Sequence, residues 1–230
     1  MRSWRRLAIP LMAAALAVSG AGLVLTSNVF ANYYAYNTSG TGTTTGTGAY
    51  TTTWTNWSVP QGSGSQAFTD EAVWIGDPNN GFASSIETGF FSGWGPTYGW
   101  TNAMDPYYTL NNGANEVDAP SGYDLPKATN IWVANHIAYN GGQAYIAVGN
   151  WSSNTISPSY SFSPRQNYTQ GEVTNSNDWM GGGSGESFTM YYQPASGYPN
   201  TYYQWGSSSC GYDSPYWGTC SGSSWNNGGY

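Results

Sequence analysis

The chain alternates short stretches rich in β-branched and aromatic residues with clusters of glycine, asparagine and proline. From residue 66 onward, apolar and polar positions alternate with the period of two that is typical of half-buried β-strands. This pattern predicts strands at 51–57, 67–75, 84–92, 130–139, 143–151, 159–163, 168–175, 187–193 and 201–205. Apolar positions at helical spacing are absent after residue 31. We therefore expect an all-β fold, an antiparallel β-sandwich or jelly roll.

The clearest hairpin signal lies in the middle of the chain. Residues 131–139 and 143–148 read as two strands, and Asn140, Gly141 and Gly142 between them tolerate the positive φ angles that a tight turn needs. This segment predicts an antiparallel pair.

The first 31 residues differ from the rest. Arg2, Arg5 and Arg6 precede an apolar run from Leu7 to Leu25, and Val29 and Ala31 occupy the positions expected before a signal-peptidase site. We expect residues 1–31 to be a removed secretion signal; a retained membrane anchor is the alternative. Residues 32–65, rich in Thr, Gly and Ser, are expected to be a linker, a short propeptide or an irregular leading hairpin, and residues 66–230 the β-sandwich domain.

Composition narrows the class of protein. Only 7% of the residues are charged and 17% are aromatic, so the chain can form a packed core. Beyond the predicted signal, only Lys127 and Arg165 stand against all 12 acidic residues, which makes nucleic acid an unsuitable partner. So few ion pairs favour tolerance of acid. We expect a secreted, monomeric protein without stable membrane association once the signal is removed.

Few side chains can supply metal or nucleophilic chemistry. Cys210 and Cys220 are the two cysteines of the chain, and in an exported protein they predict a disulfide rather than a metal site. His136 is the single histidine and lies within a predicted strand, so a structural role is expected for it. We expect no metal and no cofactor.

Carboxyl chemistry remains, and two glutamates are the best candidates. Glu87 and Glu172 lie inside strand-like segments, whereas most aspartates lie in turn-like contexts. By alternation, Glu87 shares a face with Ser85, Gly89 and Phe91, and Glu172 shares one with Tyr168, Gln170 and Thr174. Such polar and aromatic faces suit a binding groove, although each glutamate could also point to solvent.

Two sequence blocks carry a resemblance to a known family. The segment 72–90, AVWIGDPNNGFASSIETGF, is similar to the first catalytic block of the neprosin-type glutamic endopeptidases, which are related to the fungal eqolisins. The segments 171–176, GEVTNS, and 180–185, MGGGSG, resemble that family's second block. The likeness covers roughly residues 68–193.

The resemblance implies a fold, a reaction and a set of site residues. It implies a β-sandwich in which Glu87 and Glu172 face each other across a concave groove and hydrolyse peptide bonds in acid with an activated water. Glu172 would be the base and Glu87 the acid that stabilises the oxyanion. Trp74 matches a groove tryptophan and would bind substrate together with Gln170 and Tyr168. The substrate would be a peptide or protein, with proline-containing sequences favoured by the aromatic side chains.

Two other functions are compatible with the composition. Small secreted jelly-roll glycosidases of the xylanase type are also rich in Gly, Ser, Thr, Tyr and Trp, and they use two glutamates on a concave sheet. A carbohydrate-binding or adhesion module would instead stack Trp and Tyr side chains on sugar rings. Two carboxyl groups converging in one groove favour an enzyme, whereas a coplanar aromatic strip favours binding.

Overall fold

The structure is a computed structural model that describes most of the chain after residue 32. The described residues are 33–39, 44–62, 67–77, 84–96, 99–110, 115–137, 143–156, 166–174, 178–180, 186–194, 201–212 and 217–228. The predicted signal at 1–31, the predicted strand at 159–163 and the predicted turn at 140–142 lie outside them.

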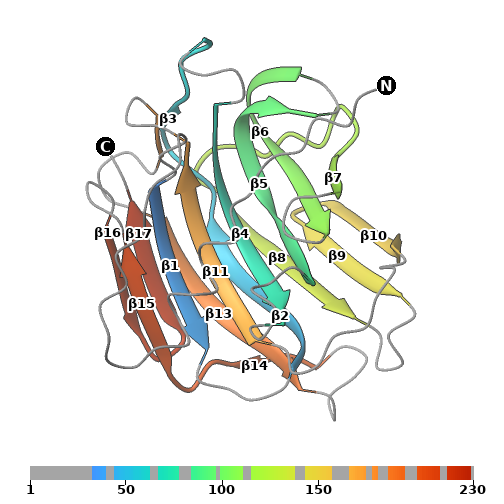
Figure 1. Ribbon diagram of the computed structural model, residues 1–230, viewed down its shortest axis with the longest axis vertical. Helices are drawn as coiled ribbons and strands as arrows, with labels where there is room; N and C mark the ends of the chain where they lie inside the picture. Colours follow the sequence, from blue (N-terminus) through green and yellow to red (C-terminus); the bar gives the residue numbers. More distant parts are fainter. Residues whose placement is uncertain are drawn as a thin grey trace.

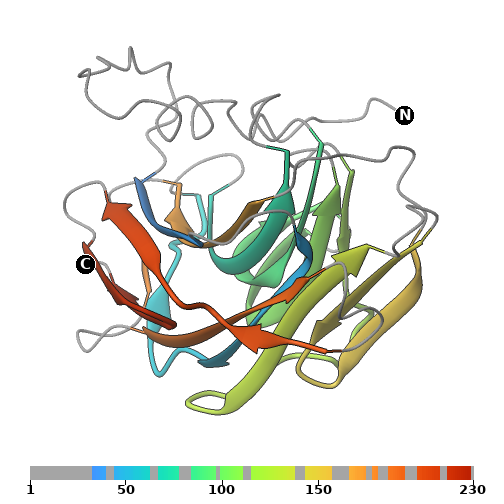
Figure 2. The ribbon, with the colours of Figure 1, turned by 90° about the horizontal axis from the view of Figure 1, so that it is seen from below.

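These residues form two large antiparallel sheets, which Figure 1 shows face-on and Figure 2 as two layers seen from below. The first sheet has the spatial order β15 (Ser208–Tyr212), β1 (Tyr33–Ser39), β11 (Gln166–Val173), β4 (Phe68–Gly76), β5 (Ser85–Gly95), β6 (Gly99–Leu110) and β7 (Asn115–Asp118). The second has the order β10 (Trp151–Ile156), β9 (Ala144–Val148), β8 (Asn130–Ile137), β2 (Thr44–Thr52), β13 (Glu186–Pro194), β17 (Ser224–Gly228) and β16 (Trp217–Ser221), with β14 (Tyr203–Gln204) also paired to β13. A small third sheet joins β3 (Trp57–Ser58) to β12 (Trp179–Met180).

The all-β sandwich predicted from the sequence is confirmed. The hairpin prediction also holds, because β8 and β9 pair antiparallel from Val133 opposite Val148 to Ile137 opposite Ala144. The described residues contain no helix, and so none that is long and apolar enough to cross a membrane.

Three of the predicted strands differ from the structure by more than their end residues. The prediction of one strand at 51–57 is wrong. β2 ends at Thr52, and Trp54, whose side chain is buried in the core, lies after the end of the strand. The strand expected at 143–151 is two strands, because Gly149 has a φ of 59° and begins the turn into β10. The strand expected at 201–205 is shortened to the two residues of β14.

The Thr- and Gly-rich leading segment contributes strands to both sheets. Residues 33–39 form β1 between β11 and β15, and residues 44–52 form β2 between β8 and β13. Glycine at position 48 of β2 makes room for a ring, because an added Cβ would lie 2.5 Å from the Trp132 side chain. This segment of low sequence complexity therefore contains β2, a central strand of the second sheet.

The main hydrophobic core lies between the two large sheets. It combines apolar residues that alternate along strands of both sheets, including Val73, Ile86, Phe90, Val133 and Trp225. Asn135 is a buried polar exception. Its Nδ2 donates across the core to the carbonyl oxygens of Val73 at 3.0 Å and Ile86 at 3.3 Å. This side chain of the second sheet therefore binds two adjacent strands of the first.

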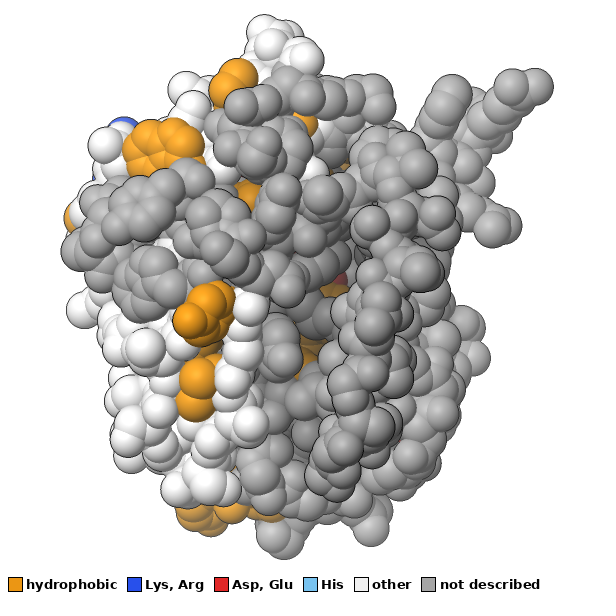
Figure 3. All heavy atoms as spheres, turned by 60° about the vertical axis from the view of Figure 1, so that its left-hand side comes forward, with side chains coloured by type: hydrophobic (Ala, Val, Ile, Leu, Met, Phe, Trp, Pro, Cys, Tyr) orange, Lys and Arg blue, Asp and Glu red, His pale blue; other side chains and the backbone are white. Residues whose placement is uncertain are grey.

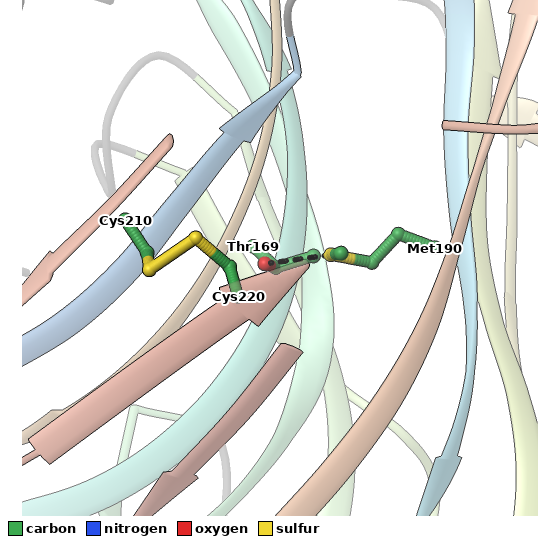
Figure 4. Close-up of a disulfide and its surroundings, with 4 residues drawn as sticks. All are labelled: Thr169, Met190, Cys210 and Cys220. Carbon is green, nitrogen blue, oxygen red and sulfur yellow. Dashed lines mark hydrogen bonds between the residues drawn. A yellow bond between two sulfur atoms is a disulfide. The ribbon is translucent and has the colours of Figure 1, made fainter. Parts of the chain in front are cut away.

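A disulfide joins the sheets at one end of the sandwich (Figure 4). Cys210 on β15 of the first sheet is bonded to Cys220 on β16 of the second, which confirms the pairing predicted from the sequence. Near it, the hydroxyl of Thr169 on β11 donates to the sulfur of Met190 on β13 at 3.5 Å, a second link between the sheets.

The outward side of the second sheet carries a cluster of rings, which we call the aromatic face: Tyr50, Trp132, His136, Tyr145, Tyr191 and Tyr202. The Trp132 ring lies 4.8 Å from that of Tyr50 and 5.2 Å from that of Tyr202, with interplanar angles of 53° and 85°. The rings therefore pack edge to face and do not form a coplanar strip. His136 is buried here, stacked on Tyr145, with its Nδ1 3.1 Å from the Tyr202 hydroxyl.

Candidate active site on the outward face of the first sheet

The candidate site lies on the side of the first sheet that points away from the second sheet. Strand alternation places Val73, Ile75, Ile86 and Phe90 in the core between the sheets, so the residues between them project outward. Cross-strand pairing arranges the outward residues in three rows, which together we call the carboxylate face. The rows are Tyr168, Trp74, Glu87 and Thr109; Gln170, Ala72, Gly89 and Tyr107; and Glu172, Asp70, Phe91 and Asp105.

The centre of this face is built from the two smallest residues in it. Ala72 and Gly89 are paired across β4 and β5 in the middle row. An added Cβ at Gly89 would lie 2.0 Å from the Glu71 carbonyl oxygen and 2.8 Å from the Ala72 Cα, so no side chain fits at this position. The middle row therefore has no large side chain of its own on β4 and β5.

Glu87 reaches toward the middle row. Its Oε1 contacts the hydroxyl of Tyr107, and Thr109 Oγ1 donates to its Oε2 at 3.4 Å. The Tyr107 hydroxyl also lies 2.8 Å from Asp70 Oδ2. One tyrosine thus links carboxyl groups that belong to two different rows.

Glu172 reaches toward the middle row from the other side. Gln170 Nε2 donates to its Oε2 at 3.3 Å, and the backbone carbonyl of Glu172 accepts from Thr69 Oγ1 at 3.0 Å. Gln170 is itself buried, so its amide holds the Glu172 carboxyl in a fixed position.

The two glutamates share one face but are not directly opposite each other. The β11 residue in the row of Glu87 is Tyr168, and Glu172 lies four positions further along that strand. Each carboxyl nevertheless binds a side chain of the row between them, Tyr107 for Glu87 and Gln170 for Glu172. The two acids therefore contact the middle row from the rows on either side of it, Glu87 at its β6 end and Glu172 at its β11 end.

Aromatic side chains flank the acids. Trp74, Phe91, Tyr107 and Tyr168 form a second, smaller hydrophobic cluster with Ala72, separate from the main core. Trp74 and Tyr168 occupy the row of Glu87: Trp74 is paired with Glu87 across β4 and β5, and Tyr168 is paired with Trp74 across β11 and β4. In Figure 3 an acidic side chain is visible in the depth of the surface beside hydrophobic ones.

Burial strongly affects ionisation on this face. Glu87 and Glu172 are 5% and 7% exposed. Burial, together with the adjacent carboxyl groups of Asp70 and Glu87, raises the pKa of Tyr107 well above its usual value, so its hydroxyl keeps its proton. At the edge of the face, burial and a hydrogen bond with Asp124 raise the pKa of Asp105 to about 6.

All five residues selected from the sequence lie on this face: Trp74, Glu87, Tyr168, Gln170 and Glu172. Sequence reasoning missed Asp70 and Tyr107. Asp70 lies in a predicted strand, two positions before Ala72, and alternation along β4 would have placed it on the same face as Trp74. Tyr107 lies on β6, which was not predicted because Asp105 and Pro106 interrupt its apolar pattern.

The remaining chemistry-bearing residues lie elsewhere. His136 is on the aromatic face of the other sheet, and burial lowers its pKa to about 4, so it is neutral at pH 7. Within the described segments, no group of three or more His, Cys, Asp and Glu side chains is arranged to hold a metal ion.

Comparison with known proteins supports the fold. No family model and no curated sequence matches the chain. Among solved structures, it is similar to SCP-B, a member of the eqolisin family of peptidases that was crystallised with the tripeptide Ala-Ile-His. The TM-score is 0.56 at 12% identity, covering 86% of this chain and 98% of SCP-B. A homodimeric agglutinin from chicken liver, CG-16, matches with a TM-score of 0.37 at 8% identity, covering 68% of this chain and 98% of the agglutinin.

Proposed function

We propose that the protein is a secreted glutamic endopeptidase that hydrolyses peptide bonds in acid with Glu87 and Glu172. The observation that carries the proposal is the pair of buried glutamates that lie on one sheet face and contact its middle row from the rows on either side. The likeness of the sandwich to an eqolisin peptidase supports it, because that family places its chemistry on the same kind of fold. The resemblance of segments 72–90 and 171–185 to the neprosin-type enzymes adds a second, independent reason.

Each glutamate takes one role in the proposed reaction. Glu172, ionised and held by Gln170, removes a proton from a water that attacks the peptide carbonyl carbon. Glu87, protonated, donates a hydrogen bond to the developing oxyanion and then gives its proton to the leaving amine. Burial strengthens both interactions, because charges act over a longer range where water is excluded. The pair works in acid, where one of two neighbouring carboxyls keeps its proton.

The surroundings of the pair suit peptides with apolar or proline residues. The rings of Trp74 and Tyr168 lie in the row of Glu87, where a flat proline ring would stack on them. The predicted signal, together with the disulfide between Cys210 and Cys220, supports secretion into an oxidising compartment.

The test is hydrolysis of a denatured, proline-containing protein from pH 2 to 7 by the purified secreted protein. We expect cleavage in acid, and its loss in both Glu87→Gln and Glu172→Gln. Glu186→Gln is the matched control, because it makes the same chemical change on β13 of the second sheet. Circular dichroism of each variant shows whether the fold is intact.

The outcomes separate the proposal from its alternatives. Cleavage that survives in the Glu87→Gln variant would show that Glu87 is not the acid. If the folded protein cleaves no protein at any pH, the same variants should be tested on a panel of polysaccharides. Sugar hydrolysis that depends on both glutamates would identify a jelly-roll glycosidase instead.

A further inference from the structure

The Tyr107 hydroxyl occupies an unusual position between two acids. It lies 2.8 Å from Asp70 Oδ2 and within hydrogen-bond contact of Glu87 Oε1. All three side chains are buried, with exposures of 1% for Tyr107, 2% for Asp70 and 5% for Glu87. We call this set the Asp70–Tyr107–Glu87 triad.

The number of protons decides what the triad can be. A tyrosine hydroxyl has one hydrogen and can donate it to only one of the two carboxyl oxygens. Were both carboxyls ionised, the second contact would bring two oxygens together with no hydrogen between them. The contact becomes favourable when one carboxyl is protonated and donates to the tyrosine oxygen. The geometry therefore calls for a second proton in addition to that of the hydroxyl, one for each of the two contacts.

We propose that Asp70 and Tyr107 are positioning residues that keep the proton on Glu87: Glu87 donates to the Tyr107 oxygen, and Tyr107 donates to Asp70. The catalytic meaning of this inference rests on the proposed peptidase function, in which Glu87 is the acid. The inference also identifies the carboxyl coupled directly to Glu87 as Asp70 rather than Glu172.

Thr109 Oγ1 donates to Glu87, but the carboxyl groups around the triad disfavour a further negative charge. Glu172 is paired with Asp70 across β11 and β4, and Asp105 lies in the same row on β6. On β7, Asp118 is paired with Tyr107 and Glu116 with Thr109. These carboxyls face the triad from every described strand that flanks it, and each adds to the cost of ionising both Asp70 and Glu87.

The triad also accounts for the proton balance of the proposed reaction. In each cycle Glu172 gains the proton of the attacking water, and Glu87 gives one to the amine. The cycle closes when the proton on Glu172 leaves and Glu87 is protonated again by exchange with solvent. A hydrogen bond from Glu87 to Tyr107 favours that recharged state before the next substrate binds.

The test follows the Glu87 carboxyl directly, without any substrate. Glutamate labelled with ¹³C at the side-chain carboxyl is incorporated into the protein, and the signal lost in Glu87→Gln identifies Glu87. We expect this signal to remain protonated at a pH where an unperturbed glutamate, with a pKa of about 4.3, has already ionised. In Asp70→Asn, where the neighbouring charge is gone, we expect its midpoint to fall by about one pH unit or more.

Tyr107→Phe supplies the second variant. It removes only the hydroxyl, so we expect a lower kcat with little change in KM, and an alkaline limb of the pH profile that moves to lower pH. Tyr108→Phe is the matched control, because Tyr108 is the next residue of β6, packs against the main core, and should leave the profile unchanged.

The results distinguish this inference from the proposed function. A Glu87 signal that titrates like an unperturbed glutamate, at about pH 4.3, in the wild-type protein would overturn the inference, even if neither Asp70→Asn nor Tyr107→Phe folds. So would a midpoint that Asp70→Asn leaves unchanged. A raised titration midpoint for Glu87 in a protein that cleaves no peptide would support the triad and reject the peptidase proposal. Peptide cleavage by a protein whose Glu87 has an ordinary midpoint would support the peptidase proposal and reject the triad.

Discussion

The two outward faces of the sandwich use glycine in opposite ways. On the carboxylate face, Gly89 lies so close to the backbone of β4 that nothing can replace its hydrogen. On the aromatic face, Gly48 makes room for the ring of Trp132, which covers it. Gly89 lets the backbones of β4 and β5 approach each other beneath the polar site. Gly48 lets the Trp132 ring lie over β2. What a strand glycine does therefore depends on whether backbone or side chain occupies the space above it.

The largest expected effect is on activity, which should depend on side chains of the carboxylate face and not on those of the aromatic face. Glu87→Gln and Glu172→Gln should each lower kcat/KM by at least about a hundredfold, because each removes one proton-transfer group. Tyr191→Phe, on the aromatic face, should change it less than about twofold. Steady-state kinetics on a fluorogenic peptide measure all three. Equal losses on both faces would mean that the substrate also uses the second sheet.

Next in size is the contrast between the two glycines. Gly89→Ala should reduce the free energy of unfolding by about 3 kcal/mol, because β4 and β5 must move apart. Gly48→Ala should cost about 1 kcal/mol, because the Trp132 ring can move aside. Urea denaturation gives both values.

Gly206→Ala is the control for this pair, because no atom lies within 4 Å of its added Cβ. It should leave the free energy of unfolding within about 0.5 kcal/mol of wild type. Equal costs for Gly89→Ala and Gly48→Ala would show that the backbone contact at Gly89 is not what restricts that position.

The disulfide should contribute about as much to the free energy of unfolding as Gly89 does, without affecting one face more than the other. Replacing both Cys210 and Cys220 by serine releases an 11-residue loop, and the chain-entropy model predicts a loss of about 3 kcal/mol. Because the bond joins the two sheets, the pH profile of activity should keep its shape while the melting temperature falls. Differential scanning calorimetry measures the fall. A changed pH profile would indicate that the bond also shapes the carboxylate face.

The smallest expected effect is on the pH dependence of stability, where the two faces act in opposite directions. The raised pKa of Asp105 makes the folded protein bind its proton more tightly, so this residue's contribution falls as the pH rises from about 4 to about 6. The lowered pKa of His136 makes the unfolded chain bind the proton more tightly, so its contribution falls as the pH drops from 6.5 to about 4.

Single variants should reveal these opposed slopes. Across pH 4 to 6, the unfolding free energy of Asp105→Asn should rise more steeply with pH than that of wild type. The unfolding free energy of His136→Phe should rise less steeply with pH than that of wild type over the same range. Denaturation at three pH values is sufficient to test both, and parallel curves for all three proteins would contradict the assignment.

Sequence reasoning identified the strands that carry the candidate glutamates because alternation survives there. In β5 and β11, apolar residues such as Ile86, Phe90 and Val173 mark the core face, so the outward face of Glu87 and Glu172 follows. It failed at β2, where Thr and Gly alternate without apolar markers, and at β6, where Pro106 argues against a strand.

The site shows a second limit of sequence reasoning. Alternation gives the face of each residue but not the row, and rows depend on pairing between strands that are distant in sequence. The contact between Tyr107 and Asp70 joins β6 to β4 across β5 and depends on the register of both pairings. No local pattern contains that information.

The disulfide also has a consequence for self-association. A sheet edge exposes unpaired N–H and C=O groups that can recruit a strand from another molecule. At one end of the sandwich, the edge strands β15 and β16 contact each other and are bonded through Cys210 and Cys220, so each edge faces its counterpart. At the other end, β7 is only four residues long and carries Glu116 and Asp118, which discourage strand addition. Reduction would release the edges of β15 and β16 from each other, so the reduced protein should associate through the end that holds them.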